Sequence, residues 1–214
     1  MLERVGRVLL DERDEARRPR RLLIAADAFA WAGEEVSDAL RAGVEKLRNA
    51  VAVTEEITVA PNGFGDWLAP YRVLQAAEIW KELGGWIRAV QPSLAPDIGE
   101  RFDWTATITA ADVARAQPVR KQVRERMRGL LQEDAVLCLP TVRGIAPLRS
   151  ASAEEKVEFR GRALSLLCIA GMAGLPQINL PLGTVDGCPC GLSILGAFGN
   201  DVMLLDLSAR VCGP

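Results

Sequence analysis

Three segments of the chain have the hydrophobic pattern of β-strands. Residues 22–26 and 135–139 are continuously apolar over the length of a strand, which predicts strands covered on both faces. Residues 51–59 instead alternate apolar and polar positions, and this pattern predicts a strand with one face in water. The expected sheet therefore has at least two strands buried between other elements.

Between these segments, apolar residues recur at the helical period of about 3.6. Two helix starts carry a capping box, in which a hydroxyl residue is followed three positions later by an acidic one: Thr109 with Asp112, and Ser152 with Glu155. Pro118 is expected to kink the helix that Thr109 opens. The predicted helices span residues 2–10, 34–50, from 67–70 to 84–85, 110–130, 153–169 and 202–211.

The segment AGLPQINLPLGTVDGCPCGLSILG, residues 173–196, holds two further apolar runs, 177–182 and 190–195. An Asp-Gly turn signal separates the runs, so they predict an antiparallel hairpin. Pro176 and Pro181 bracket the first run, and buried strands explain this composition without any ligand. Strand and helix patterns thus alternate along the chain, which predicts an α/β fold with a mixed sheet flanked by helices.

The composition agrees with a single α/β domain over residues 1–214. Of these residues 49% are hydrophobic, but no apolar run reaches the roughly 18–20 residues that a membrane-spanning helix needs. The first 21 residues are charged and lack the apolar core of a signal peptide. We therefore expect a cytoplasmic protein that has no membrane partner.

Charge gives no support for nucleic-acid binding. The net charge is −2, and the basic run at 17–21 follows acidic residues at 11, 12, 14 and 15. Mixed charge of this kind favours a solvated linker over a contact with nucleic acid.

The chain contains no histidine, which excludes Ser-His-Asp and Cys-His catalysis and histidine-ligated metals within this sequence. Cys188 and Cys190 offer two thiolates, but zinc needs four ligands and typically a wider spacing. We expect no metal, no cofactor and five reduced cysteines. A catalytic base would have to be a lysine, a carboxylate or a group from outside the chain.

The remaining candidates for chemistry have ordinary surroundings. Asp27 follows a predicted strand and Asp134 precedes one; both could reach a cleft, but strand-end caps are the favoured interpretation. Four tryptophans could line a pocket for an aromatic substrate, although packing in the core or a lid is favoured: Trp67, Trp80, Trp86 and Trp104. The lysines lie on helices, where solvated charges are favoured: Lys46, Lys81, Lys121 and Lys156.

An ordered series of segments resembles the C-terminal half of amidase-signature enzymes. The segments are DAVLCLPTV at 134–142, LCIAGMAGLPQINLPLGT at 167–184 and GCPCGLSILGAFGNDVMLL at 187–205. Upstream, QAAEIWK at 75–81 is similar to the indoleacetamide-hydrolase-like members of that family. The resemblance implies a partial mixed sheet flanked by helices, and hydrolysis of carboxylic amides by the complete fold.

One departure from that family is large. Its enzymes use a serine nucleophile activated by a second serine and a lysine, and the lysine must be neutral to accept the proton. None of the seven serines in this chain is next to another, and none lies in a Gly-Ser-Ser or Gly-x-Ser-x-Gly motif. The resemblance therefore implies a C-terminal portion that lacks the triad and is inactive alone.

The same resemblance implies that the chain forms the far wall of the pocket for a small-molecule amide. It places the loop 141–147 and the segment 168–171 against the acyl-binding cavity. Two alternatives stay open: a non-catalytic binding or interaction module on an amidase scaffold, and one subunit of a split amidase. The expected partner is an amidase N-terminal half, or a second copy bound through an exposed sheet edge. The candidate pocket residues are Thr141, Val142, Ile145, Cys168, Ile169 and Gly171.

Overall fold

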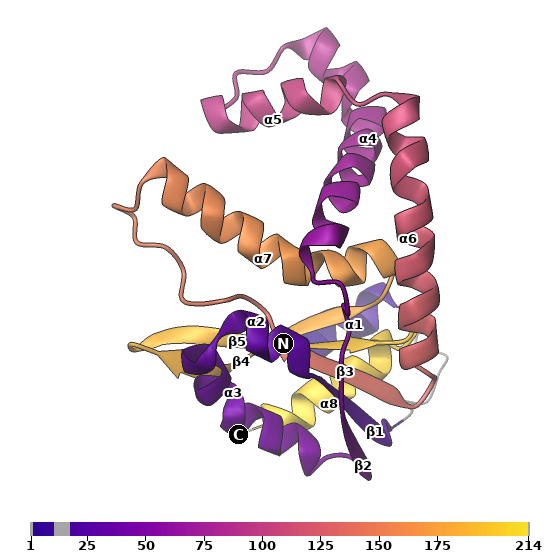
Figure 1. Ribbon diagram of the computed structural model, residues 1–214, viewed down its shortest axis with the longest axis vertical. Helices are drawn as coiled ribbons and strands as arrows, with labels where there is room; N and C mark the ends of the chain where they lie inside the picture. The colour runs from indigo at the N-terminus through magenta and orange to yellow at the C-terminus, as the bar shows by residue number, and fades with distance from the viewer. Residues whose placement is uncertain (1, 11–17, 214) are drawn as a thin grey trace.

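A computed structural model describes residues 2–10 and 18–213, and it contains a five-stranded mixed sheet (Figure 1). The strand order is β2-β1-β3-β5-β4. β1 pairs in parallel with β2 and β3, whereas β5 pairs antiparallel with β3 and β4. The strands are β1 (Arg21–Ala25), β2 (Val53–Ile57), β3 (Ala135–Pro140), β4 (Gln177–Val185) and β5 (Cys188–Gly196).

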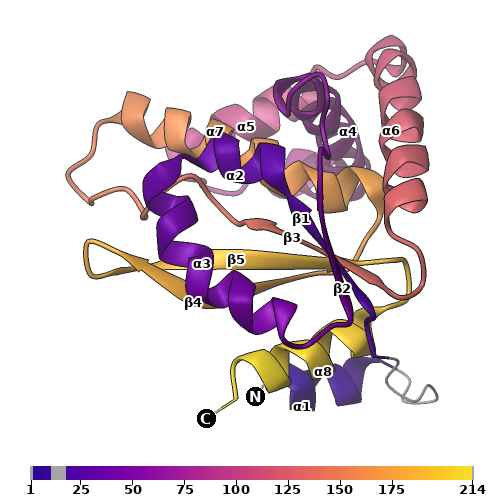
Figure 2. The same cartoon turned by 60° about the horizontal axis from the view of Figure 1, so that its bottom comes forward.

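Helices cover both faces of this sheet. In Figure 2, α4, α6 and α7 lie on one side of the strands, and α3 and α8 lie on the other. The fold class predicted from the sequence is thus confirmed. The helices are α1 (Leu2–Leu9), α2 (Ala26–Ala32), α3 (Glu34–Arg48), α4 (Gly65–Val90), α5 (Pro96–Ala106), α6 (Ala110–Leu130), α7 (Ala153–Ala173) and α8 (Asp201–Val211).

The strands β1 and β3 contribute side chains to two separate cores, because successive side chains of a strand point to opposite faces of the sheet. Leu137 of β3 joins a buried cluster with residues of α4, α6 and α7, including Met127 and Ile169. Its neighbour Val136 joins a second cluster with residues of α3 and α8, including Leu40. Residues 22–25 and 135–139 are therefore buried on both faces of the sheet, as predicted, whereas Ala26 begins α2 and is exposed.

The helices α4 and α6 extend away from the sheet, and α5 lies at their far end (Figure 1). The capping box at the start of α6 is present, since the Asp112 backbone N–H donates to Thr109 Oγ1 at 3.2 Å. The second box opens α7, where the Glu155 N–H donates to Ser152 Oγ at 3.1 Å. None of the described helices is both long and apolar enough to cross a membrane.

The predicted hairpin forms with a tight turn. Asp186 and Gly187 both have positive φ angles, 48° and 74°, as the hairpin turns favoured by strand twist require. Pro181 does not end the first strand as expected, because β4 continues to Val185 through a register shift between Leu180 and Gly183. β4 is an edge strand, where proline at an irregularity costs no ladder hydrogen bond.

Three element predictions were wrong or incomplete. The strand predicted at 51–59 is shorter, and Val53 is 48% exposed because β2 is the outer strand on its side of the sheet. α4 continues past residues 84–85 to Val90, because Gly84 packs under the Trp80 ring rather than ending the helix. The short helices α2 and α5 were not predicted. Residues 11–17 of the predicted linker lie outside the described residues.

Candidate functional site

Polar side chains meet where β3 ends. The Thr141 hydroxyl donates to Asn179 Oδ1 at 2.6 Å and lies 2.8 Å from Ser193 Oγ. The Gln177 side-chain amide donates to the same serine oxygen, at 2.8 Å. We call these four residues, Thr141, Gln177, Asn179 and Ser193, the Thr141 network.

Strand pairing brings these residues together on one face of the sheet. Asn179 of β4 pairs with Ser193 of β5, and Ser193 pairs with Leu139 of β3. Ile178 and Leu180 alternate with the network residues of β4 and pack into the core on the α3 and α8 side. The Thr141 network therefore faces the side of the sheet that carries α4, α6 and α7.

The hydrogen bonds of the network run in one direction. Thr141 donates to Asn179, so its oxygen accepts from the Ser193 hydroxyl, whose own oxygen accepts from Gln177. Ser193 is fully buried, whereas Asn179 is exposed. In a series of hydrogen bonds of this kind, each bond strengthens the next, and the orientation of the outermost group is fixed. The network thus presents the Asn179 amide N–H groups to incoming molecules.

Glycine at position 191 is required by this arrangement. A Cβ atom there would lie 2.1 Å from Asn179 Oδ1 and 2.8 Å from Thr141 Oγ1. The Gly191 carbonyl also accepts the Thr141 backbone N–H at 2.9 Å, which fixes the turn after β3. The backbone of β5 therefore holds the hydroxyl of Thr141 in place.

The six candidate pocket residues do not all face the same part of the molecule. Thr141 belongs to the network, and Val142 follows it, half-buried, in the turn after β3. Ile145 packs against the core on the α3 and α8 side, whereas Ile169 is fully buried in the opposite core. Residues 168 and 171 of α7 instead approach α4.

The contact between α7 and α4 centres on Tyr71. A Cβ atom on Gly171 would lie 2.8 Å from Tyr71 Cε2, so the absence of a side chain there lets the two helices approach. Burial raises the pKa of the Tyr71 phenol, and the nearby Cys168 raises it further. Tyr71 Oη accepts a hydrogen bond from Gln75 Nε2 at 2.7 Å. The phenol therefore stays protonated at neutral pH.

Asp27 and Trp67, which were also considered for chemistry, have structural roles. Both carboxylate oxygens of Asp27 accept backbone N–H groups, from Val59 at 3.0 Å and Ala60 at 2.7 Å, and so fix the chain after β2. All four lysines are exposed, as predicted. Trp67 packs at 6.3 Å from the Phe64 ring in the core, which confirms the packing interpretation for this tryptophan.

Sequence reasoning missed Gln177, Asn179 and Ser193 as site residues. The available signal was polar residues at alternate positions within otherwise apolar strands. Gln177 and Asn179 are two apart, and Ser193 is set between Leu192 and Ile194. Such positions are expected to share one face of a sheet, but only strand register shows that they meet.

A family model described as Amidase matches residues 75–205, which is more than half of the chain. The chain belongs to the amidase family. The resemblance inferred from the sequence is confirmed, and it is carried by the same segments that build β3, α7 and the hairpin of β4 and β5.

Two curated relatives match this chain over roughly two thirds of its length. Amidase 1 of Arabidopsis thaliana is 35% identical over 136 residues, which are 64% of this chain and 32% of that protein. Outer envelope protein 64, chloroplastic, from the same plant is 30% identical over 135 residues, 63% of this chain and 23% of that protein. The match therefore spans about a third or less of the length of these relatives.

Solved structures of similar fold cover nearly the whole chain. Kluyveromyces lactis allophanate hydrolase has a TM-score of 0.71 and 24% identity, covering 95% of this chain and 35% of that chain. A crystal structure titled as an amidase has a TM-score of 0.69 and 21% identity, covering 92% of this chain and 46% of that chain. At this level of identity, the comparison establishes the fold.

The cysteines of the chain fall into two groups. Cys188 and Cys212 are exposed, whereas Cys138, Cys168 and Cys190 are buried. Burial raises the pKa of the Cys138 thiol and of the Cys168 thiol to about 12, because the thiolate is poorly solvated there. Within the described residues, no three His, Cys, Asp or Glu side chains come together as a metal site would require.

We predict that Ellman's reagent labels only Cys188 and Cys212 in the folded protein, even at pH 9. The thiols of Cys138 and Cys168 remain protonated at that pH because burial raises their pKa to about 12, and only the thiolate reacts. Cys190 is protected because its side chain is buried away from the reagent. Denaturation under anaerobic conditions is expected to release all five thiols. A lower number, or stoichiometric zinc or copper by elemental analysis, would contradict this expectation.

Proposed function

We propose that the chain forms one wall of the substrate pocket of an amide hydrolase, and that the catalytic serines and lysine come from an N-terminal amidase portion. That portion belongs either to the same polypeptide or to a separate subunit. The observation that carries the proposal is the Thr141 network, which presents oriented hydrogen-bond donors at the end of β3. Membership of the amidase family supports the reaction class.

The network suits the recognition of a carboxylic amide. The Asn179 amide N–H groups can donate to a substrate carbonyl. The hydrogen bonds of Gln177 and of the buried Ser193 fix the donor direction along the network. A preorganised donor loses little entropy on binding and stabilises charge that develops on the carbonyl oxygen. In this proposal, residues of the network position the substrate and the missing triad performs the attack.

The candidate residues Val142, Cys168 and Gly171 are proposed to extend this wall toward α4, where Tyr71 lies. The Cys168 thiol has a pKa of about 12, so it acts as apolar surface rather than as a nucleophile. The wall would then be polar at Thr141 and apolar along α7. This combination suits an amide that carries an aryl or alkyl group.

We predict that the purified chain does not hydrolyse benzamide or indole-3-acetamide. None of its seven serines is adjacent to another, and its four lysines are exposed to solvent, so the chain has no serine pair beside a buried lysine. Ammonia release would be measured by a coupled assay over several hours. Turnover that disappears on substitution of a single residue of this chain would refute the proposal.

A second candidate function is a non-catalytic interaction module on the amidase scaffold. Some relatives are named as envelope or translocon proteins. Examples are Outer envelope protein 64, chloroplastic, of Arabidopsis thaliana, and Translocon at the outer membrane of chloroplasts 64 of Pisum sativum, which is 30% identical over 133 residues. These names favour an alternative use of the scaffold, and they leave the cytoplasmic location of this chain a prediction. Partner binding without amide turnover would favour this candidate.

A further inference from the structure

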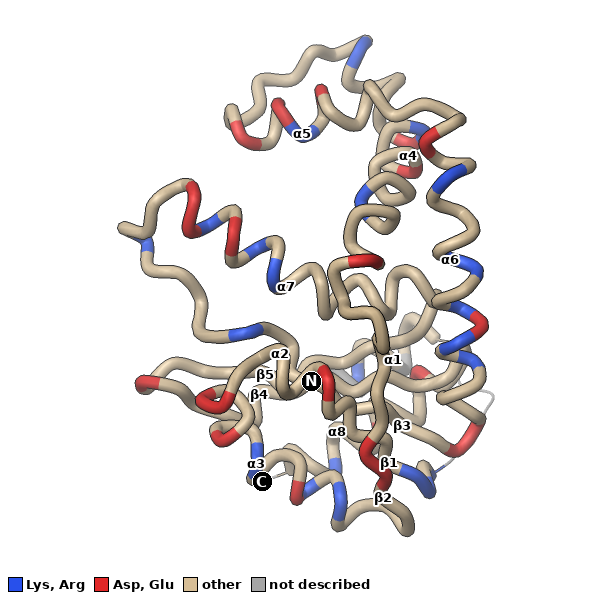
Figure 3. Tube along the Cα trace, viewed as in Figure 1, with Lys and Arg blue, Asp and Glu red and all other residues tan. Residues whose placement is uncertain are grey.

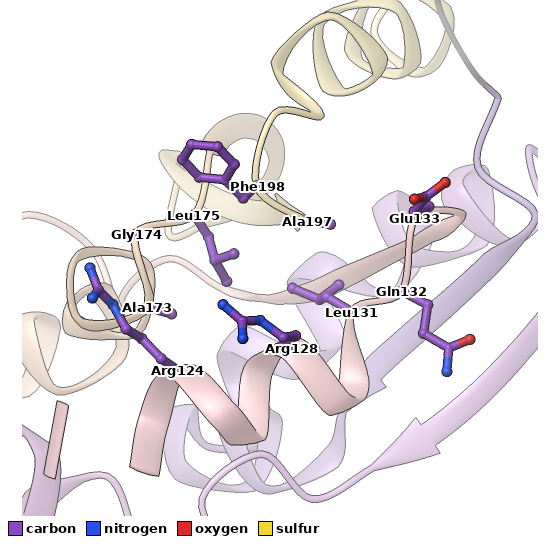
Figure 4. Close-up of a pocket in the computed structure, with 10 residues that line it drawn as sticks. All are labelled: Arg124, Arg128, Leu131, Gln132, Glu133, Ala173, Gly174, Leu175, Ala197 and Phe198. Carbon is purple, nitrogen blue, oxygen red and sulfur yellow. The ribbon is translucent and has the colours of Figure 1, made fainter. Parts of the chain in front are cut away.

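The largest described cavity lies far from the Thr141 network. Its volume is about 660 Å³, and its walls come from the last turns of α6, the end of α7 and the turn after β5 (Figure 4). It reaches residues 131–133, which precede β3, whereas Thr141 follows that strand. A strand of this length separates the two places by about 20 Å at 3.3 Å per residue.

One side of the cavity is basic. Arg124 and Arg128 are four positions apart on α6, so they lie on the same face of the helix, and Figure 4 shows both side chains at the cavity. Within the part of the chain that the structure describes, neither guanidinium has an ion-pair or hydrogen-bond partner. Each of these two arginines therefore keeps its five N–H donors for a ligand.

Basic residues are frequent along α6 (Figure 3). Those other than Arg124 and Arg128 form ion pairs or hydrogen bonds. Arg120 binds Glu78 at 3.0 Å, and Lys121 lies 3.8 Å from Glu125. Arg115 binds Asp112, and Arg126 donates to the backbone carbonyls of residues 58 and 59. Arg124 and Arg128 are thus distinguished from their neighbours by lacking such a partner and by lining a cavity.

The opposite side of the cavity is apolar. Phe198 lines this side and is 87% exposed, so its ring is open to a ligand (Figure 4). Gly174 has a φ angle of 71°, and a Cβ atom there would lie 3.6 Å from Arg124 Nη2, so the absence of a side chain leaves room beside this guanidinium. The remaining apolar wall is formed by Leu131, Ala173, Leu175 and Ala197.

We propose that this cavity binds a small organic monocarboxylate with an aryl body. The carboxylate would bridge Arg124 and Arg128, since planar guanidinium groups match carboxylate geometry, and the aryl group would cover Phe198. The volume falls within the range of small-ligand pockets. Glu133 also lines the cavity and lies away from Arg124 in Figure 4, so the carboxylate of the ligand would bind at the arginine side.

The test uses 3-phenylpropionate as the probe and the full chain as the protein, with any partner that the chain needs to stay monomeric. Titration followed by NMR of the isotope-labelled protein is expected to show saturable shifts at residues 124, 128 and 198. The neutral 3-phenylpropionamide has nearly the same shape and is expected to bind at least about tenfold more weakly, because it lacks the charge-assisted hydrogen bonds. Arg128→Gln and Arg124→Gln are each expected to weaken binding of the acid by about tenfold.

Lys121→Gln is the matched control, because it removes a positive charge from the same helix outside the cavity. It is expected to leave binding unchanged, and thermal melts would establish that every variant is folded. The proposal is overturned if the acid and the amide bind equally, if no saturable shift occurs up to about 10 mM, or if Lys121→Gln weakens binding as much as Arg128→Gln. Equal binding of inorganic phosphate would also overturn it, since the aryl body would then be irrelevant.

Discussion

Addition of an amidase N-terminal portion is expected to raise the melting temperature of the chain and to suppress its self-association. Val8, Leu9, Leu148 and Val157 are each at least 65% exposed, and β2 and β4 are the edges of the sheet. Exposed apolar side chains and open strand edges favour association. Burial of even ~400 Å² of apolar surface contributes about 10 kcal/mol before the entropic cost of association.

Size-exclusion chromatography and thermal melting measure this effect. The chain by itself is expected to elute as mixed oligomers, and co-expression with the partner portion is expected to raise its melting temperature by about 5 °C or more, since each kcal/mol shifts a domain of this size by about 2–4 °C. A monodisperse monomer that melts cooperatively above ~60 °C, a high value for a mesophilic domain, would contradict the expectation that this surface needs a partner.

The Leu137→Ala substitution is expected to lower the free energy of unfolding by about 3–5 kcal/mol. Leu137 is fully buried in β3, the middle strand, and packs in the core shared with α4, α6 and α7. Removal of its side chain leaves a cavity that the neighbouring strands cannot close, because both are held by backbone pairing. The loss is a large fraction of the stability of a typical domain.

Val53→Ala is the control for that substitution. Val53 lies on the edge strand β2 and is 48% exposed, so its loss is expected to change stability by no more than about 0.5 kcal/mol. Urea denaturation of both variants, performed with any partner that the chain needs to stay monomeric, gives the comparison. Equal effects of the two substitutions would mean that β3 is not the centre of the core.

The parts of the fold that local patterns determine were predictable from the sequence. The uninterrupted apolar runs of β1 and β3 indicated strands buried on both faces, and the capping boxes at Thr109 and Ser152 placed the starts of α6 and α7. The Asp-Gly pair gave the turn between β4 and β5. In each case a few consecutive residues carry the physical cause of the structure.

Other features depend on contacts between distant parts of the chain and could not be predicted locally. Gly84 looked like a helix end, but it packs under the Trp80 ring within a continuous α4. Ser193 looked like one polar residue in a core strand, and only the register of β3, β4 and β5 brings it to Thr141. Membership of the amidase family was predictable because it rests on ordered segments rather than on tertiary contacts.

The most direct test of the proposed function measures amide hydrolysis by the chain combined with an amidase N-terminal portion that carries the serine pair and the lysine. We expect turnover to appear only in the combined preparation. We also expect Thr141→Val to lower kcat/KM by about tenfold or more, because it removes the donor to Asn179 Oδ1 and the acceptor of the Ser193 hydroxyl proton. Thr184→Val, at an exposed position of β4, is the control and should keep full activity. Turnover that is unaffected by Thr141→Val, or a combined preparation that binds but never hydrolyses an amide, would contradict the proposal that this chain forms a wall of the substrate pocket.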